Sequence, residues 1–171
     1  MLVGGATFSP FTAVGLVLGV VSFFNILYGT LVGISKFEVK DIEFHHPNLP
    51  KAFDGYRIVQ LSDIHIGSWI DNEKTINELV ELVNAQKPDL IVFTGDLVNQ
   101  RSCELEGFQD ILAQLHAKDG VYSILGNHDY GSYYHWKNLK EQVNNIDNLI
   151  RMQKTMGWKL LNNEYDILHH E

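Results

Sequence analysis

The segment RIVQLSDIH (Arg57–His65) sets a pattern that LIVFTGDLV (Leu90–Val98) and VYSILGNHD (Val121–Asp129) follow. Each segment begins with a near-continuous apolar run, which is typical of a strand buried on both faces of a parallel sheet. Each then passes into carboxylate, imidazole or amide side chains. Because chemistry in open α/β sheets collects at the carboxyl ends of the strands, we expect these polar residues to meet in one site.

The rest of the sequence between and after these segments predicts helices. Apolar residues recur at helical spacing over Asn72–Ala85, Leu105–Ala117 and Trp136–Met156. Strands that alternate with helices indicate an α/β fold with a largely parallel sheet. Two further stretches are expected to contribute, 35–56 as a connector with an edge strand and 158–168 as a hairpin.

Composition limits the classes to which the protein can belong. The 171 residues carry a formal net charge of -8, whereas a nucleic-acid binder needs a basic surface, so nucleic acid is not an expected partner. Cys103 is the sole cysteine, which excludes an internal disulfide and a cysteine-based zinc site. A phosphate-ester substrate stays compatible with the acidic excess, since bound divalent cations would invert the local field.

An apolar segment precedes the three motifs. Phe11–Ile34 contains no charged residue, and as a helix it would be about 36 Å long, enough to cross a bilayer. A cleaved signal peptide would carry a positive region in front of this segment, and a buried core helix of this length would be unusual in so small a domain. We therefore expect a single span in a bacterial cell membrane.

The charges that flank this segment predict its orientation. Lys36, Lys40 and Lys51 follow it and no basic residue precedes it, so the folded part is expected on the cytoplasmic side. The predicted organisation is an uncharged leader (1–10), a transmembrane helix (11–34), a connector (35–55) and a catalytic portion (56–171).

The first two polar segments contain groups that could bind a cation. Asp63 and His65 are two residues apart, so on an extended chain they point the same way. Asp96 follows Gly95, which allows the backbone to turn sharply beside a ligand. Taken singly, an aspartate after a strand is equally typical of a turn. The occurrence of these groups in order, each after a strand, favours a metal site.

The third polar segment is the most specific. Asn127 can bind a cation through its amide oxygen, His128 can protonate a leaving group, and Asp129 can fix the tautomer of the histidine. Carboxylate, imidazole and amide oxygen together suit divalent transition metals. These residues favour a metal-dependent hydrolase.

The order DIH, GDLV, GNHD resembles the calcineurin-like metallophosphoesterase family. The lead-in LPKAFDGYRIVQLSDIHIGSW (Leu49–Trp69) is similar to its membrane-associated bacterial branch, some members of which act on nucleotide-linked lipid precursors such as UDP-2,3-diacylglucosamine. The resemblance implies a four-layer αββα sandwich around a dinuclear site. It also implies a membrane-proximal or lipid-linked phosphoester substrate, and leaves the oligomeric state open.

By match to the family motifs, the resemblance implies the ligands of two divalent ions, which could be Mn, Fe, Zn or Mg. Asp63 and His65 would bind the first ion, Asp96 would bridge both, and Asn127 would bind the second. A hydroxide bridging the two ions would attack phosphorus in line.

The resemblance also implies the catalytic groups. His128 would stabilise and protonate the departing oxygen, and Asp129 would orient His128. Arg101, a few residues beyond the second motif, could meet a substrate phosphate, although a solvated loop arginine is the commoner outcome.

One part of the family pattern is not found. The family has a later lone histidine and a Gly-His-x-His segment, whereas only His135, His169 and His170 follow the third motif here. We therefore expect the chain to be the N-terminal portion of a catalytic domain. The leading hypothesis is a membrane-tethered phosphoesterase. The alternatives are a membrane-anchored binding or scaffold protein with an inactive metal site, and a metallohydrolase that completes its site across a dimer.

Overall fold

The computed structural model describes residues 9–169, apart from the side chain of Ile34. Most of the predicted leader, together with His170 and Glu171, lies outside the described residues. The chain divides into two compact units at the boundary between Glu43 and Phe44, and each is described by itself.

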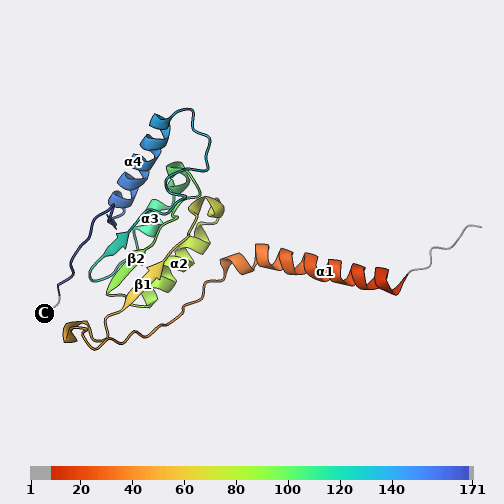
Figure 1. Ribbon diagram of the computed structural model, residues 1–171, viewed down its shortest axis with the longest axis horizontal. Coiled ribbons are helices and arrows are strands. Elements are labelled where there is room, and N and C mark those ends of the chain that lie inside the picture. The colour runs from red at the N-terminus through yellow and green to blue at the C-terminus, as the bar shows by residue number, and fades with distance from the viewer. Residues whose placement is uncertain (1–8, 170–171) are drawn as a thin grey trace, which may run out of the picture. The chain divides into compact units, whose positions relative to one another are not determined.

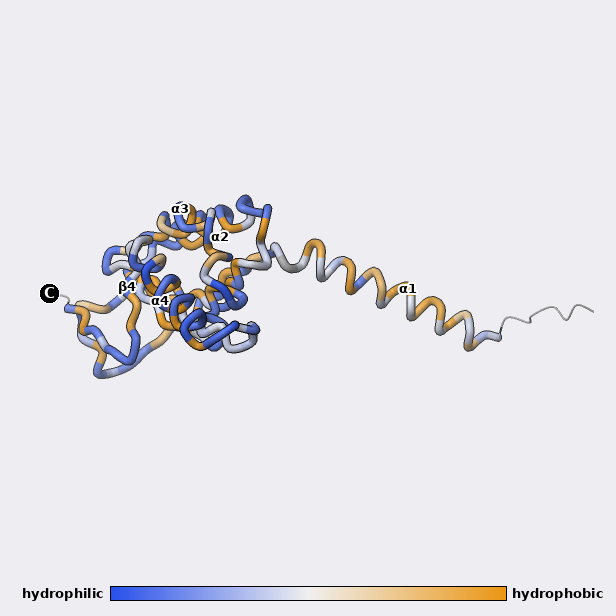
Figure 2. The backbone as a smooth tube through the Cα atoms, turned by 90° about the horizontal axis from the view of Figure 1, so that it is seen from above, coloured by the Kyte–Doolittle hydropathy of each residue, from blue (hydrophilic) through white to orange (hydrophobic). Residues whose placement is uncertain are grey.

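The first unit contains one long helix, α1 (Pro10–Leu31), followed by a single 3-10 turn, η1 (Gly33–Ser35). Its 22 residues span about 33 Å, and hydrophobic residues line its whole course (Figure 2). By length and composition it could cross a membrane, and none of its apolar window is buried.

Two polar side chains within α1 are satisfied locally. The Asn25 amide donates to the carbonyl of Val21 at 3.0 Å, and the Thr30 hydroxyl donates to the carbonyl of Ile26 at 2.5 Å. A helix in lipid needs its polar groups satisfied internally because no water is present there. These bonds meet that requirement, as expected for a helix that enters a bilayer.

The second unit is built on one sheet of four parallel strands (Figure 1). The strands lie in the order in which they occur along the chain: β1 (Ile58–Leu61), β2 (Leu90–Phe93), β3 (Val121–Ser123) and β4 (Lys159–Leu160). The α/β class and the parallel sheet predicted from the sequence are confirmed, and the described residues contain one sheet of the predicted sandwich.

Helices and 3-10 turns connect the strands. The helices are α2 (Glu73–Ala85), α3 (Gln109–Leu112) and α4 (Leu139–Thr155), and the turns are η2 (Lys51–Phe53), η3 (Ile66–Trp69) and η4 (Ser102–Leu105). Connections between parallel strands are right-handed, and each connection here leads to the next strand on the same side of the one before it. The connecting helices α2, α3 and α4 therefore cover the same face of the sheet.

Burial along the strands agrees with this one-sided cover. In one register row, Phe93 and Ser123 are fully buried, and Ser123 donates to the Gln153 side chain of α4 at 2.6 Å. The next row points to the opposite face, where Val92 and Tyr122 are only half-buried. The described helices thus bury one face of the sheet, and among the described residues the other face is only partly covered at this row.

Three further predictions on secondary structure are wrong. The helix expected over 105–117 is reduced to α3, because Gly107 has a φ of +87° and the chain beyond Leu112 continues in 3-10-type turns. The hairpin expected over 158–168 is absent: β4 pairs parallel to β3, and no strand follows it among the described residues. The connector contains the turn η2 and no strand.

Candidate metal centre

The polar segments leave the sheet at one edge. Parallel pairing sets Leu61 beside Phe93 and Phe93 beside Ser123, so β1, β2 and β3 end together. Past the strands the first two segments remain paired: the amide of Asp63 donates to the carbonyl of Gly95 at 3.0 Å, and that of His65 to the carbonyl of Asp96 at 3.1 Å.

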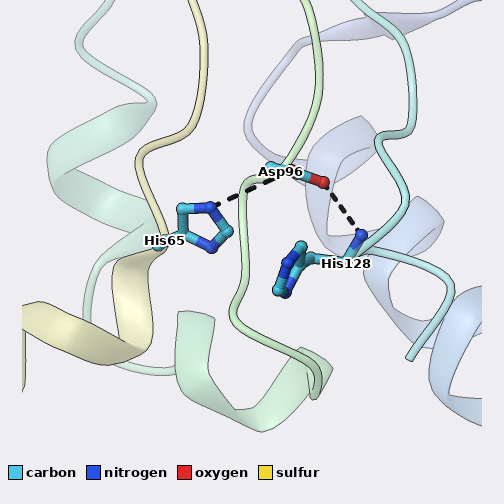
Figure 3. Close-up of side chains that lie close together, drawn as sticks. All are labelled: His65, Asp96 and His128. Carbon is cyan, nitrogen blue, oxygen red and sulfur yellow. Dashed lines mark hydrogen bonds and ion pairs between the residues drawn. The ribbon is translucent and has the colours of Figure 1, made fainter. Parts of the chain in front are cut away.

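Three predicted site residues converge at this edge. One ligand atom each of His65, Asp96 and His128 lies within 4.8 Å of the others (Figure 3). Nε2 of His65 is 3.9 Å from Oδ2 of Asp96, and the two imidazole rings meet edge to face with centroids 4.7 Å apart. Nitrogen and oxygen donors from three strands therefore surround one small volume, which is the arrangement that cation binding requires.

Asp63 extends this cluster toward solvent. Its Oδ1 is 3.8 Å from Nε2 of His65, and its side chain is 64% exposed. The hydroxyl of Ser62 donates to its other oxygen. Asp63 and His65 therefore do share one side of the segment, as the spacing predicts.

The backbone is strained at these residues. Asp63, His65 and Asp96 have φ values of +54°, +46° and +58°, in the left-handed region that non-glycine residues rarely adopt. Such conformations cost about 1–3 kcal/mol each and persist where the surrounding structure enforces them. Asp71, Lys87 and Asn163, outside the site, share this conformation, so what distinguishes the three predicted ligands is that they combine it with convergence of their side chains.

Asp129 lies beneath the cluster, and its carboxylate is fully buried. Oδ2 accepts the amides of Asp96 and Gly126 at 2.8 and 2.9 Å, and Oδ1 accepts those of Leu97 and Val98 at 2.9 and 3.1 Å. Burial raises the pKa of the Asp129 carboxyl above its ordinary value, and the four amide bonds oppose that rise. Asp129 thus joins the second and third segments instead of contacting the His128 ring.

A different group orients His128. Its Nδ1 is 2.7 Å from the carbonyl oxygen of Asn99. A carbonyl only accepts, so Nδ1 carries the hydrogen and Nε2 is the nitrogen left for a cation or a mobile proton. The orienting partner predicted from the sequence, Asp129, is replaced in the structure by the Asn99 backbone.

Glu104, in η4, holds this carbonyl in place. Its carboxylate accepts the amide of Asn99 at 2.6 Å and that of Arg101 at 3.0 Å, and it is almost wholly buried, with 11% of the side chain exposed. The loop that carries Asn99 is therefore fixed from both of its ends. Sequence reasoning missed Asn99 because any residue supplies a carbonyl, whereas Glu104, three residues after Arg101, has the spacing of a capping-box acid.

The other two predicted site residues lie at the margin. The amide nitrogen of Asn127 donates to the hydroxyl of Tyr133 at 3.1 Å, which leaves the amide oxygen for a cation. The Tyr133 ring in turn packs on His128, with centroids 4.9 Å apart. Arg101 lies further out, with its guanidinium 5.2 Å from the centre of the Tyr134 ring.

These donors fit divalent metals: carboxylate, imidazole and amide oxygen are the ligands that such ions prefer. A model of the calcineurin-like phosphoesterase family matches residues 56–171. The chain belongs to this family. Divalent metals serve the phosphoesterases of the family, and the cluster of His65, Asp96 and His128 is where this chain could bind them.

Named relatives extend the family assignment. The chain is 35% identical over 104 residues to a "transmembrane protein with metallophosphoesterase domain" of Danio rerio, covering 61% of the chain and 24% of the relative. It is 36% identical over 103 residues to the "UDP-2,3-diacylglucosamine pyrophosphatase LpxG" of Chlamydia trachomatis, covering 58% and 31%. To the "uncharacterized metallophosphoesterase YkuE" of Bacillus subtilis it is 38% identical over 87 residues, covering 50% and 30%.

The chain thus spans between a quarter and a third of the length of these phosphoesterases. No solved structure matches it. The chain has one helix, α1, that could cross a membrane by its length and composition, and the D. rerio relative is named a transmembrane protein.

Two glycines allow the second and third segments of the phosphoesterase to touch. A Cβ on Gly95 would lie 2.4 Å from the amide nitrogen of Gly126, and a Cβ on Gly126 would lie 2.2 Å from Oδ1 of Asp96. Both distances are too short for a carbon atom. The backbones of the two segments therefore approach as closely as they do only because both positions lack a side chain.

Gly95→Ala is accordingly expected to destabilise the chain more than Gly120→Ala. Both glycines have a positive φ, +102° and +90°, but a Cβ on Gly120 would meet nothing within 4 Å. Gly120→Ala should lower the free energy of unfolding by about 1 kcal/mol, because of backbone strain. Gly95→Ala should show the same loss and, in addition, a loss of roughly 1–3 kcal/mol from overpacking. Urea unfolding of the chain in detergent measures both; equal losses would contradict the close approach.

Proposed function

We propose that the whole protein is a membrane-tethered hydrolase of phosphoric esters that works with two divalent metal ions. The observation that carries this proposal is the convergence of the His65, Asp96 and His128 donor atoms at the ends of three parallel strands. Mn, Fe, Zn and Mg all suit this mixture of nitrogen and oxygen donors.

The proposed metal ligands are four side chains. Asp63 and His65 would hold one ion, Asp96 would be shared between the two ions, and Asn127 would offer its amide oxygen to the second. The short separations of Asp63 and Asp96 from Nε2 of His65, 3.8 and 3.9 Å, support the grouping. When bound, the ions would withdraw charge from the phosphoryl group and lower the pKa of water.

His128 is proposed to deliver a proton to the leaving oxygen. With Nδ1–H directed at the Asn99 carbonyl, the second proton of the charged imidazole resides on Nε2, and that is the atom that can reach the departing oxygen. Tyr133 packs on the ring and limits its rotation. The fixed orientation supports general acid catalysis, which depends on geometry before it depends on pKa.

Asp129 and Arg101 take different parts in this proposal. Asp129 acts on the site through the backbone, because its four amide bonds fix the segments that carry Asp96 and His128. Arg101 is positioned to meet the negative charge of the substrate at the margin of the site.

The proposed substrate is a phosphoester with a lipid-linked part. The C. trachomatis relative is named for the hydrolysis of UDP-2,3-diacylglucosamine, and a helix able to enter a bilayer would hold the catalytic unit near such a substrate. We propose α1 as the tether, residues 35–55 as the connector and residues 56–171 as part of the catalytic domain. Lys36 and Lys40, just beyond α1, favour the cytoplasmic side.

The test uses the whole protein in detergent micelles, loaded with Mn²⁺. We expect it to hydrolyse bis(p-nitrophenyl) phosphate or p-nitrophenyl phosphate, to lose this activity with a chelator, and to bind about two ions per chain. His128→Ala should lower kcat by about 10²–10⁴, whereas His116→Ala, at an exposed histidine, should leave kcat unchanged. No turnover of either ester would overturn the proposal, and no more than one weakly bound ion would favour a binding or scaffold role.

A further inference from the structure

A polar cavity adjoins the metal centre. Its volume is about 330 Å³, and it lies between η4, the segment 134–137 and the first turn of α4. A second cavity of about 570 Å³ continues it along α4, and the two share Ser102, Trp136, Glu141 and Asn145. Both sizes fall in the usual range for small-molecule sites, and nothing in the proposed chemistry uses them.

Two chain segments connect the cavity to the metal centre. Asn99, whose carbonyl orients His128, is two residues from Arg101 in the cavity wall. On the other side, Tyr133 packs on His128 and the next residue, Tyr134, lines the cavity. The two loops that contact the His128 ring therefore continue directly into the wall of this cavity.

One wall of the cavity is aromatic and held rigidly. Tyr134 and Trp136 pack together with centroids 4.6 Å apart, and the indole N–H of Trp136 donates to the carbonyl of Gly131 at 2.7 Å. The indole ring also lies directly over Gly131, where a Cβ would be 2.9 Å from it. Such a wall can accept a flat ring by stacking at little entropic cost.

The cavity carries charged groups of both signs: Glu141 lies in its lining, and Asp147 and Arg151 line the larger cavity. The Arg101 guanidinium lies over Tyr134 at 5.2 Å, and its Nε is 4.0 Å from the Glu104 carboxylate. Among residues 9–169, no hydrogen-bond acceptor contacts the two terminal nitrogens of Arg101. Lys137 and His135 also line the cavity. Arginine in this setting is suited to a phosphate.

The remaining lining decides which organic group the cavity can hold. Polar side chains continue along α4, where Asn144, Asn148 and Arg151 line the larger cavity, and neither cavity has an aliphatic residue in its lining. The apolar surface of the smaller cavity comes from the rings of Tyr134 and Trp136 and from Cys103, which suits a flat ring, and the polar side chains suit hydroxyl groups. A nucleotide supplies all three features: an anion, hydroxyls and a ring.

We propose that this cavity binds the nucleoside phosphate part of the substrate, with the phosphate on Arg101 and the base against Tyr134 and Trp136. The inference rests on the proposed function, because it assigns the part of the substrate that does not carry the lipid. It places the acyl part outside the cavity.

The test measures binding without turnover, on the chain in detergent after a chelator has removed metal. Uridine 5′-monophosphate is the probe, with inorganic phosphate and uridine as its two parts. Trp136 is half-buried while Trp69 and Trp158 are buried, so quenching of tryptophan fluorescence excited at long wavelength should report Trp136. We expect saturable quenching by the nucleotide and at least tenfold weaker binding of either part.

Variants assign the binding to the cavity. Arg101→Ala should weaken nucleotide binding at least tenfold by titration calorimetry, and Trp136→Phe should remove the fluorescence response. Arg57→Ala is the matched control, because Arg57 precedes β1 and contacts the carbonyl of Gln86, far along the chain from the cavity.

Three outcomes would overturn the inference: no binding of the nucleotide, inorganic phosphate that binds as tightly as the nucleotide, or an Arg57→Ala loss equal to that of Arg101→Ala. The outcome is independent of catalysis. If the protein binds the nucleotide but hydrolyses no ester, the cavity assignment stands and the proposed function fails. If it hydrolyses an ester but does not bind the nucleotide, the proposed function stands and the cavity assignment fails.

Discussion

Asp129→Ala is expected to lower the stability of the globular unit more than any other single substitution at the site. The carboxylate is fully buried and accepts four backbone amides, those of Asp96, Leu97, Val98 and Gly126. A buried donor left without a partner costs about 1–3 kcal/mol. Loss of all four hydrogen bonds should therefore cost about 4 kcal/mol or more, which is at the upper end of single-residue effects.

Asp129→Asn separates the contribution of the hydrogen bonds from that of the side-chain volume. Asparagine keeps one oxygen, which can still accept two amides, while its NH₂ group faces the other two amides donor to donor. It also removes the cost of burying a charge, which raises the pKa of Asp129. We therefore expect a loss for Asp129→Asn that is smaller than for Asp129→Ala but still large.

Thermal unfolding of the chain in detergent, followed by circular dichroism, measures both variants. A loss of this size should lower Tm by more than about 10 °C. Asp147→Ala is the control, because Asp147 is exposed on α4 and its removal should change Tm by only a degree or two. If Asp129→Ala and Asp147→Ala unfolded at the same temperature, the four amide bonds would not support the segments as described.

Asp96→Asn is expected to weaken metal binding strongly and, in the whole protein, to abolish turnover. One Asp96 oxygen is 3.9 Å from Nε2 of His65 and the other accepts the amide of His128 at 2.9 Å, so the carboxylate is at the centre of the donor cluster. Asparagine can preserve the amide bond but supplies no negative charge to a cation. Mutation of a residue that only hydrogen-bonds to a metal ligand typically lowers metal affinity by about 10–100-fold. Loss of a ligand shared by both ions should therefore weaken Mn²⁺ binding by at least about 100-fold.

Asp89→Asn is the matched control for Asp96→Asn. Both aspartates are buried, at 8% and 9% exposure, but Asp89 accepts the amide of Arg57 and pairs with Lys118 at the other end of the sheet. Mn²⁺ affinity by electron paramagnetic resonance and turnover of a nitrophenyl ester are the two readouts. Asp89→Asn should leave both near their original values, and an Asp96→Asn protein with unchanged affinity would refute the bridging role.

Periodicity and motif order predicted most of the architecture. The alternation of apolar runs and helical segments gave the parallel sheet, and the three polar segments do meet at its carboxyl edge. The same reasoning predicted a helix over 105–117 because Leu105, Phe108, Ile111 and Leu112 are spaced as on a helix. Those residues are buried, so the pattern identified core positions correctly, but the backbone at Gly107 turns instead of continuing a helix.

The contacts within the site were less predictable. Two of the groups that organise it are a backbone carbonyl, that of Asn99, and the amides bound by Asp129, and main-chain groups leave no mark in a sequence. The left-handed conformations of Asp63, His65 and Asp96 also depend on tertiary bonds between the segments. Composition and spacing therefore predicted which side chains gather, while their orientation required the structure.

The order of the strands has a consequence for how the protein is made. Because β1 to β4 adjoin in the order of synthesis, each new strand can add to the edge of the one before it as the chain emerges from the ribosome. At about 5–20 residues per second, the interval between β2 and β3 lasts seconds. The four amides that Asp129 accepts come from residues made before it or close to it, so the Asp63 and Asp96 segments are synthesised before the side chain that fixes them. The bonds that hold the centre together can therefore close only after all three segments have been made.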